Sequence, residues 1–414
     1  MGRFVKRNLK FQLQELPSAR VPRTRIDRLV AEHARALSDR LVAHRAELFP
    51  PDAHKTLRRF NSIETARFLR VSDAWLRRLA LDGRGPTPAK GPKRGWYYTS
   101  HDIAALRHLL EEGSRVPGTY MPGRRDGDHL QVICVVNFKG GSGKTTTAAH
   151  LAQRCALDGY RVLAIDVDPQ ASLSMLHGVQ PELDLFDGGT LWDAIRDEDP
   201  RPLRELIRPT CFANLDLVPG NLDLMDFEHE TPRLLAQEGA ARSGNPFFTK
   251  IAEALESVEA DYDLVVIDCP PQLGFLTMAA LSAATAVLVT VHPQMLDVMS
   301  MCQFLLMTSD LLGVVAEAGG NMEYDWLRYL VTRYEPGDGP QNQMVSFMRT
   351  LFGEHVLNHP VLKSTAISDA ALTKQTLYEV EKGAFSRSTY ERALESLDAV
   401  NGEIQGLIQK AWGR

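Results

Sequence analysis

Residues 139–146 of this 414-residue chain have the composition of a phosphate-binding loop. They read Lys-Gly-Gly-Ser-Gly-Lys-Thr-Thr and lie between an apolar run at 132–137 and a helical pattern that opens at 148. Glycines allow a tight turn that aims backbone N–H groups at phosphate oxygens, and the helix start adds the positive end of its dipole. In such a loop Lys144 reaches the β- and γ-phosphates and the Thr145 hydroxyl binds Mg²⁺. The loop residues that we expect to bind the nucleotide are Lys139, Gly140, Gly141, Ser142, Gly143, Lys144, Thr145 and Thr146.

The loop departs from the ordinary GxxxxGK[ST] pattern at two positions. Phe138 stands where that pattern has a glycine, and Lys139 lies five residues before Lys144 with no evident partner in its own phosphate site. This KGGxGKT[ST] form resembles the deviant Walker A ATPases, among them the ParA partition ATPases. The resemblance implies that Lys139 crosses to the nucleotide of a second subunit, so that ATP binding and homodimer formation would be one event.

Three carboxylates end the apolar runs that follow the loop. Asp166 and Asp168 end the run at 161–167 and point the same way at the strand period of two, whereas Asp268 ends the run at 263–267. Parallel sheets bind ligands at the carboxyl ends of their strands, and an acid after four apolar residues fits the Walker B position that holds the Mg²⁺ shell. By resemblance to the ParA family, Asp168 positions the attacking water and Asp166 supports Mg²⁺ hydration. The expected catalytic residues are thus Lys139, Lys144 and Asp168, and the expected metal-site residues are Thr145, Asp166 and Asp268.

Two further segments resemble family elements around the nucleotide. Cys269-Pro270-Pro271 resembles the DxPP signature, whose prolines stiffen the loop beside the γ-phosphate. The segments 289–293 and 332–334 occupy the places of the adenine contacts, which adds Pro293 and Arg333 to the expected ATP-binding residues.

The chain from residue 131 onward predicts an α/β fold. Apolar runs that alternate with helical patterns indicate a parallel β-sheet buried on both faces, the ParA/MinD-like P-loop NTPase fold. The predicted strands lie at 131–138, 160–167, 215–220, 262–269, 285–292 and 327–334. Small and polar residues predict a mobile loop at 230–245, and the region after 337 is predicted to be mostly helical.

The front of the chain is basic and its body is acidic. Residues 1–130 hold 26 Lys and Arg against 14 Asp and Glu, a net +12, and the remainder holds 21 against 38, a net −17. Segments 62–69 and 74–79 have helix-turn-helix spacing, with Ile63, Ala66 and Leu69 on one face of the first helix. The cationic stretch 84–98 resembles a MerR-like wing, and a helix at 101–112 is expected behind it. The expected DNA-binding residues here are Arg77, Arg78, Lys90, Lys93 and Arg94.

These patterns divide the chain into four parts. Residues 1–50 form an N-terminal helical segment, expected to serve dimerisation, and Pro50-Pro51 ends it. Residues 51–115 form an α-helical winged helix-turn-helix DNA-binding domain. A linker rich in glycine, proline and arginine follows at 116–130, and residues 131–414 form the ParA-type ATPase domain.

Composition points to a cytoplasmic protein, and the resemblance to the ParA partition ATPases implies a bacterial one. We expect no apolar run near the roughly 18 residues that a membrane span needs, and the first residues lack a signal-peptide core. The five cysteines are widely spaced without a CxxC pair, so buried thiols in a reducing compartment are expected rather than disulfides or zinc.

Nearly the whole chain resembles the RepA partition ATPases of RepABC-type plasmids. Segments at 217–233, 289–313, 328–341 and 362–380 carry the likeness beyond the ATPase signatures. It implies plasmid segregation by a nucleoid-associated homodimer that hydrolyses ATP slowly on its own. It also implies a ParB-like centromere-binding partner, autorepression through the front domain, and nonspecific DNA binding near Lys363 and Lys374.

Three alternatives stay open at this point. A MinD-like positioning ATPase shares the loop but needs a basic amphipathic C-terminal helix for the membrane. The tail here has Leu394, Leu397, Val400, Ile404 and Leu407 at helical spacing beside acidic side chains, so it is expected to pack on the domain. A relative of the nitrogenase iron protein would need cluster ligands that the cysteines do not supply. An ATP-switched transcriptional repressor without a motor role is the third.

Overall fold

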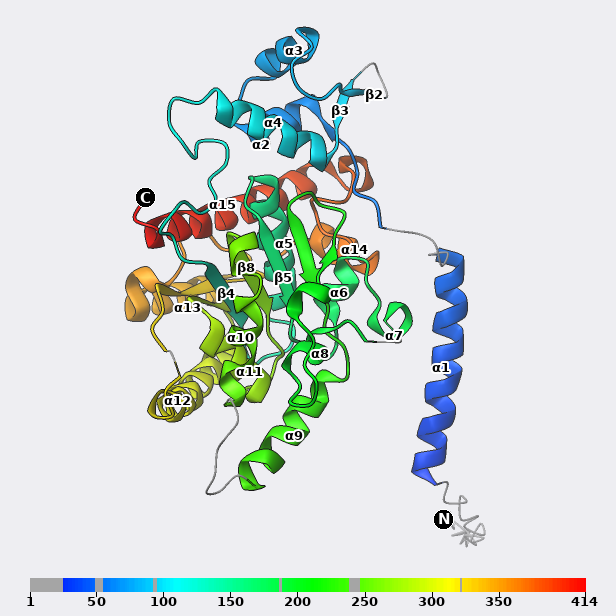
Figure 1. Ribbon diagram of the computed structural model, residues 1–414, viewed down its shortest axis with the longest axis vertical. Helices are drawn as coiled ribbons and strands as arrows, with labels where there is room; N and C mark the ends of the chain where they lie inside the picture. Colours follow the sequence, from blue (N-terminus) through cyan, green and yellow to red (C-terminus); the bar gives the residue numbers. More distant parts are fainter. Residues whose placement is uncertain (1–24, 49–54, 92–94, 186–187, 238–245, 321) are drawn as a thin grey trace, which may run out of the picture. The chain divides into compact units, whose positions relative to one another are not determined.

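The computed structural model describes residues 25–48, 55–91, 95–185, 188–237, 246–320 and 322–414 (Figure 1). It divides into two units, Met1–His54 and Lys55–Arg414, each of which is considered by itself. The first unit contributes helix α1 (Ile26–Leu48), which confirms a helix within the predicted N-terminal segment. The apolar side chains Ile26, Val30 and Leu37 of α1 are exposed.

The second unit is built on a seven-stranded sheet in the order β10-β9-β4-β8-β5-β7-β6. All six strands predicted from apolar runs are confirmed, and their pairings are parallel. The two-residue edge strand β6 pairs antiparallel with β7 and was not predicted, because two residues that include a proline give no strand pattern. The strands are β4 (Gln131–Val136), β5 (Val162–Asp166), β6 (Arg208–Pro209), β7 (Leu215–Val218), β8 (Leu264–Asp268), β9 (Ala286–Val291) and β10 (Trp326–Val331).

Helices cover both faces of this sheet (Figure 1). One face packs on α5 (Lys144–Leu157), α14 (Thr365–Leu372) and α15 (Arg387–Ala411), and the other on α8 (Leu191–Ile195), α10 (Lys250–Glu256), α11 (Phe275–Ala283), α12 (Met295–Glu317) and α13 (Gly339–Phe352). Shorter α6 (Ser172–Leu176) and α7 (Pro181–Asp184) follow β5, and α9 (Leu224–Gln237) follows β7. The prediction of a loop from residue 230 is wrong up to Gln237, because α9 continues there, and 238–245 lie outside the described residues. The prediction that the tail packs on the domain is confirmed, since α15 buries Leu397, Val400 and Ile404.

The front of the second unit combines three helices with a small antiparallel sheet of order β1-β3-β2. Its elements are β1 (Phe60–Asn61), α2 (Ser62–Leu69), α3 (Asp73–Leu81), β2 (Ala89–Lys90), β3 (Trp96–Tyr98) and α4 (Ser100–Glu112). Asn61 caps α2 in a capping box with Glu64. The predicted apolar face of α2 is partly wrong: Ala66 and Leu69 are buried as expected, but Ile63 is 65% exposed and Phe68 is buried instead.

A buried arginine ties this front part to the large sheet. The Arg107 guanidinium on α4 donates to the Leu157 carbonyl at 2.8 Å and to the Asp158 carboxylate at 3.1 Å, both at the end of α5. It also donates to the Phe68 carbonyl of α2 at 2.6 Å. One side chain therefore joins α2, α4 and the helix that follows the glycine-rich loop.

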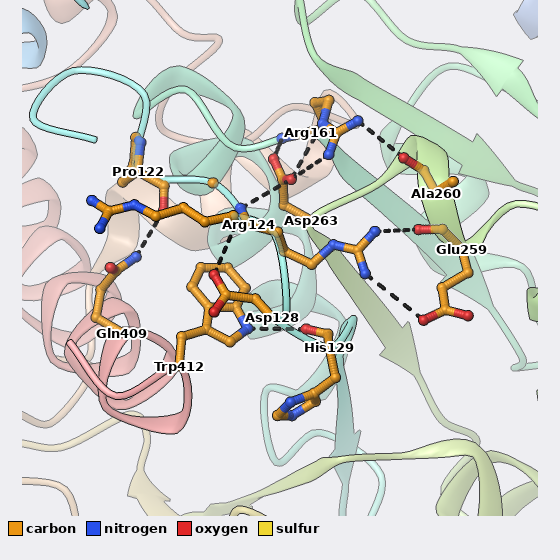
Figure 2. A network of polar contacts seen from close by, with 12 residues as sticks. Pro122, Arg124, Asp128, His129, Arg161, Glu259, Ala260, Asp263, Gln409 and Trp412 are labelled. Atoms are coloured by element: carbon orange, nitrogen blue, oxygen red, sulfur yellow. Dashed lines mark hydrogen bonds and ion pairs between the residues drawn. The ribbon is translucent and has the colours of Figure 1, made fainter. Parts of the chain in front are cut away.

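The connecting segment 116–130 is fixed along the amino-terminal edge of the sheet (Figure 2). The backbone N–H of Arg124 donates to the Asp263 carboxylate at 3.2 Å, just before β8 begins. The Trp412 indole N–H at the end of α15 donates to the His129 carbonyl at 3.0 Å. This segment thus passes the edge opposite to the carboxyl ends of the strands.

Helix α12 and one cysteine correct two expectations from composition. Met295–Glu317 is a single helix that, by length and composition, is long enough and apolar enough to cross a membrane, with a mean hydropathy of 1.6. No such helix was predicted from the sequence, because Asp297 and Asp310 interrupt the apolar run. All five cysteines are unpaired, as expected, but Cys302 on α12 is exposed rather than buried.

Candidate nucleotide-binding site

A pocket of about 530 Å³ opens where β4, β5 and β8 end, at the carboxyl edge of the sheet. The order β4-β8-β5 places the glycine-rich loop and the three predicted carboxylates on adjacent strands. The lining comprises Gly140, Gly141, Gly143, Lys144, Thr145, Thr146, Thr147, Asp168, Gln170, Ser172, Pro271, Thr332, Arg333, Val361, Leu362, Lys363, Ser364, Ile367, Ser368 and Ala371.

The loop has the backbone that its glycines predict. Gly141 and Gly143 have φ of +79° and +90°, in the left-handed region that disfavours other residues. Ser142 fixes the turn, because its hydroxyl accepts from the Thr290 hydroxyl at 3.0 Å and its carbonyl accepts from Thr332 at 2.7 Å. Among the described residues no side chain caps the start of α5 at Gly143, so its first N–H groups are available to an anion.

Lys144 points into the interior of the loop. It is buried, and its ammonium donates to the Lys139 carbonyl at 3.5 Å. Burial lowers the pKa of Lys144, while the carboxylates of Asp268 and Asp168 act in the opposite direction. A buried cation of this kind is well placed to hold an anionic ligand.

Asp268 is the most exceptional charge of the site. It is fully buried at the end of β8, and in the described part of the chain neither carboxylate oxygen has a well-formed hydrogen bond, although the Thr145 hydroxyl interacts with the carboxylate. Burial raises its pKa well above the ordinary value, and the nearby Asp166 carboxylate adds to the effect, whereas Thr145 and Lys144 counteract it. An orphaned buried carboxylate beside a threonine hydroxyl fits a Mg²⁺ site, in which water and phosphate oxygens complete the shell.

Asp166 and Asp168 have different surroundings. Asp166 is fully buried and accepts two bonds from Ser174, from its N–H and its hydroxyl, each at 2.7 Å. Burial raises the pKa of Asp166 to about 7, although the bonds from Ser174 counteract this. Asp168 lies on the pocket wall, where its carboxylate accepts the Gln170 N–H at 2.9 Å. Within the described chain Asp166 thus orders the 168–174 turn, and its support of Mg²⁺ hydration remains a prediction.

Both unusual residues of the loop contact α12. The Phe138 ring stacks on Phe304, with centroids 5.5 Å apart and planes at 18°. The Lys139 ammonium forms an ion pair with Asp297, and the same carboxylate lies 3.1 Å from His292 Nδ1. The side chain of Lys139 is 46% exposed, so its cation lies at the surface rather than inside its own phosphate loop.

The second wall of the pocket includes residues that the sequence did not indicate. Ser364, Ile367, Ser368 and Ala371 come from the start and body of α14, more than 200 residues after the loop. A signal was present at 364, because a serine before an apolar helical pattern predicts an N-cap, and Ser364 does cap α14. Sequence spacing alone gives no reason to place this helix at the mouth of the loop.

The predicted adenine contacts lie in different places. Arg333 lines the pocket, and its guanidinium donates to the Gly141 carbonyl at 3.2 Å. Pro293 is buried after β9 and is not among the lining residues. Lys363, predicted to bind DNA, lies on the pocket wall and pairs with Glu335 at 2.9 Å.

The described members of the predicted DNA-binding set in the front part lie on its surface. Arg77 and Arg78 on α3 are largely exposed and face Asp73 at 2.9 Å and Asp82 at 3.9 Å. Lys90 is exposed on β2. Lys93 and Arg94 lie outside the described residues.

Comparison with known proteins agrees with this architecture. A family model described as an AAA domain matches residues 130–312. A replication protein A of Rhizobium rhizogenes is 53% identical over 93% of this chain and 95% of its own length. Protein SopA of Escherichia coli is 31% identical over 87% of this chain and 92% of its own length. A solved structure of a partition protein, 19% identical, shares the fold with a TM-score of 0.57 over 92% of this chain and 99% of that one. With two long relatives above 30% identity, the chain belongs to the RepA group of the ParA family of partition ATPases.

Proposed function

We propose that this chain is a plasmid partition ATPase that binds ATP with Mg²⁺, dimerises, binds DNA and releases it on hydrolysis. The observation that carries the proposal is the unpartnered, buried Asp268 beside Lys144 and Thr145 at the head of an uncapped helix. A cation-binding carboxylate next to an anion-binding loop is the arrangement that a metal–nucleotide complex requires.

Magnesium would be held by the Thr145 hydroxyl and Asp268, with Asp166 behind them. No group of three or more His, Cys, Asp or Glu in the described ranges is arranged to hold a metal alone, so phosphate oxygens are needed to complete the shell. When bound, Mg²⁺ neutralises charge on the β- and γ-phosphates. Lys144 and the first N–H groups of α5 orient the same phosphates, and Asp168 on the pocket wall orients the attacking water.

Lys139 gives this ATPase its link to assembly. Its half-exposed cation pairs with Asp297 on α12. In the proposed homodimer it leaves Asp297 and reaches the nucleotide of the second subunit. Lys139→Gln should therefore abolish ATP-dependent association while ATP binding persists, and Asp168→Ala should keep ATP and DNA binding while stopping turnover.

The front part is proposed as a winged helix-turn-helix domain that binds the operator. Support comes from α2 and α3 joined by a three-residue turn, from the β2–β3 hairpin, and from the net charge of +12 over residues 1–130. Arg77→Ala and Arg78→Ala should weaken operator binding and flatten its salt dependence, because each lost phosphate contact lowers the slope by about 1. Autorepression of its own operon would follow from occupancy of that site.

Helix α1 is proposed as a second, nucleotide-independent contact between subunits. Its exposed Ile26, Val30 and Leu37 follow a helical period, and an apolar stripe of this kind packs against a matching helix. Val30→Glu with Leu37→Glu should dissociate the nucleotide-free dimer, whereas ATP-dependent association should persist. The proposed domains are thus a dimerisation helix within 1–50, a DNA-binding domain at 51–115, a linker at 116–130 and the ATPase domain at 131–414.

The decisive experiment measures ATP hydrolysis with and without DNA and the ParB-like protein of the same operon. A slow basal rate that both additions raise together identifies a partition motor working in the bacterial cytoplasm. An ATP-switched repressor would change operator affinity with nucleotide but show no stimulated turnover, and that result would refute the motor proposal. Nonspecific DNA binding through Lys363 is tested alongside with Lys363→Gln, which should lower affinity for random-sequence DNA.

A further inference from the structure

The outward face of α12 is apolar, although the described parts of the chain leave it uncovered. Asp310 is the one charged residue between positions 298 and 314. Monomeric proteins rarely expose a largely apolar face of this length, about 35 Å for a 23-residue helix, although Gln303, Ser309 and Asp310 interrupt it. The large exposed side chains are Met295, Leu296, Met299, Leu306, Met307, Leu311 and Val314.

The first turns of α12 lie beside the exposed lysine of the phosphate loop. Asp297, in the first turn, pairs with Lys139, and Phe304, two turns later, stacks on Phe138. Two contacts thus hold this part of α12 against the loop, and they use the two residues by which the loop departs from the ordinary pattern. Leu296 directly precedes Asp297 in the chain, Met295 lies one residue further away, and both are exposed.

A lysine that reaches into a second molecule brings its surroundings into contact with that molecule. Asp297 is almost fully buried and Lys139 is half exposed, so the ion pair lies at the surface of the protein. Met295 is 60% exposed and Leu296 is 74% exposed just outside that pair. When Lys139 inserts into a second subunit, these side chains cannot remain in water.

We infer that Met295, Leu296 and Met299 form an apolar contact with a second copy of this chain, next to Lys139. The inference rests on the proposed function, because it assumes that ATP brings Lys139 to a second subunit. It adds the surface that excludes water around that lysine, and exclusion of water strengthens the charge interactions inside the interface. Leu306 and Met307, about 12 Å further along the helix from Met299, lie outside the contact.

The test compares substitutions at matched exposure on the same helix. Leu296→Glu and Met299→Glu probe the proposed contact, and Leu306→Glu and Met307→Glu are the controls, at 64% and 57% exposure in the native chain. Sedimentation velocity of the full chain with Mg²⁺ and either ATP or ADP gives the ATP-linked part of association, since any contact through α1 is common to both. Retained ATP affinity and circular dichroism show that each variant is folded.

We expect the proximal variants to lose the ATP-linked part and the distal variants to keep it. One buried side chain of this size strengthens association by about tenfold or more, and two-fold symmetry counts each substitution twice, so a loss of about 100-fold is expected. Wild-type association that does not depend on ATP would refute the proposed function itself. ATP-linked wild-type association that survives in the proximal variants, or that falls equally in the distal ones, would overturn this inference alone. Unchanged association with loss of binding to anionic lipid vesicles would assign the face to a membrane and overturn it as well.

Discussion

Strand β8 has a buried carboxylate at each end, and the fold treats the two in opposite ways. Asp263 precedes the strand at the amino-terminal edge, where it accepts from the Arg161 N–H at 2.8 Å and the Arg161 guanidinium at 2.6 Å (Figure 2). The Arg161 Nε and the Arg124 N–H each add a further bond at 3.2 Å. Asp268, five residues later at the carboxyl edge, has no well-formed hydrogen bond to either oxygen among the described residues, and only the Thr145 hydroxyl and the Lys144 cation counteract its burial there.

The difference separates a structural charge from a functional one. A buried carboxylate without partners costs free energy, so a fold retains it only where something outside the chain completes it. Asp263 is completed by the chain and ties the segment around 124 to the start of the sheet. Asp268 is left for a ligand, and it lies beside the loop that binds phosphate in related folds.

Asp268→Asn is the strongest way to break this comparison. The amide keeps the shape but loses the charge that holds Mg²⁺, so turnover of ATP should fall by about 100-fold or more. Thermal stability should stay equal or rise, because the substitution removes an unpaired buried charge. Steady-state ATPase assays and thermal melts without nucleotide measure the two effects. A folded variant with near-normal turnover would show that Asp268 is as structural as Asp263.

Asp263→Asn should give the reverse pattern. It removes the charge from Asp263, whose partner Arg161 is 46% exposed, so the ion pair itself contributes about 1 kcal/mol, and the N–H groups that lose their acceptor add about 1 kcal/mol or more. We expect a lower free energy of unfolding in urea, while the protein that remains folded keeps the ATP turnover of the wild type. Unchanged stability with loss of turnover would mean that Asp263, rather than being structural, is the carboxylate on which ATP hydrolysis depends.

The sheet and the loop could be predicted from sequence because their signals are local. Six apolar runs gave six strands, and a parallel sheet brings the ends of β4, β5 and β8 to one edge. That rule alone placed Lys144, Thr145, Asp168 and Asp268 near one another. It did not show that Asp166 would turn its oxygens to Ser174, because a side chain eight residues on competes for them only once the turn has formed.

The other features depend on contacts between distant segments. The stacking of Phe138 on Phe304 and the pairing of Lys139 with Asp297 join residues more than 150 positions apart. Composition also did not predict that one face of α12 is exposed. An apolar helix has the same sequence pattern whether the fold covers it or leaves it exposed. The placement of Ile63 on the same face as Ala66 and Leu69 was wrong for a similar reason. In a helix of eight residues, helical periodicity alone does not show which side faces the core.

Buried histidines show a third way to treat a polar group, which is to keep it neutral. The two ring nitrogens of His150 face the Thr146 carbonyl at 2.7 Å and the Leu377 N–H at 3.2 Å, which suits a neutral ring. Burial lowers the pKa of His150 and of His177 to about 4. The unfolded chain binds these protons near pH 6.5, so stability present above that value is lost as pH falls toward 4.

The expected loss is roughly 1 kcal/mol per histidine at pH 5.5 and roughly 3 kcal/mol at pH 4. Urea unfolding between pH 7 and pH 4 measures it. His150→Gln removes one of the two groups and should make the decline about half as steep, although it lowers stability at pH 7 through the lost bonds. An equally steep decline in the variant would assign the acid sensitivity to other groups.

Asp297 is the intermediate case, and the smallest effect is expected there. It is buried like Asp263 and Asp268, and its partner Lys139 is half exposed, as Arg161 is beside Asp263; a pair of that kind contributes no more than about 1 kcal/mol. Asp297→Asn should therefore release Lys139 at little cost to folding and tighten ATP-linked association up to about fivefold. Sedimentation with ATP and with ADP measures the change, and Lys139→Gln in the same background should remove it. Weaker association in Asp297→Asn would instead mean that the Asp297 carboxylate takes part in the contact between subunits. A buried carboxylate with a half-exposed partner in its own chain would then be functional, as Asp268 is.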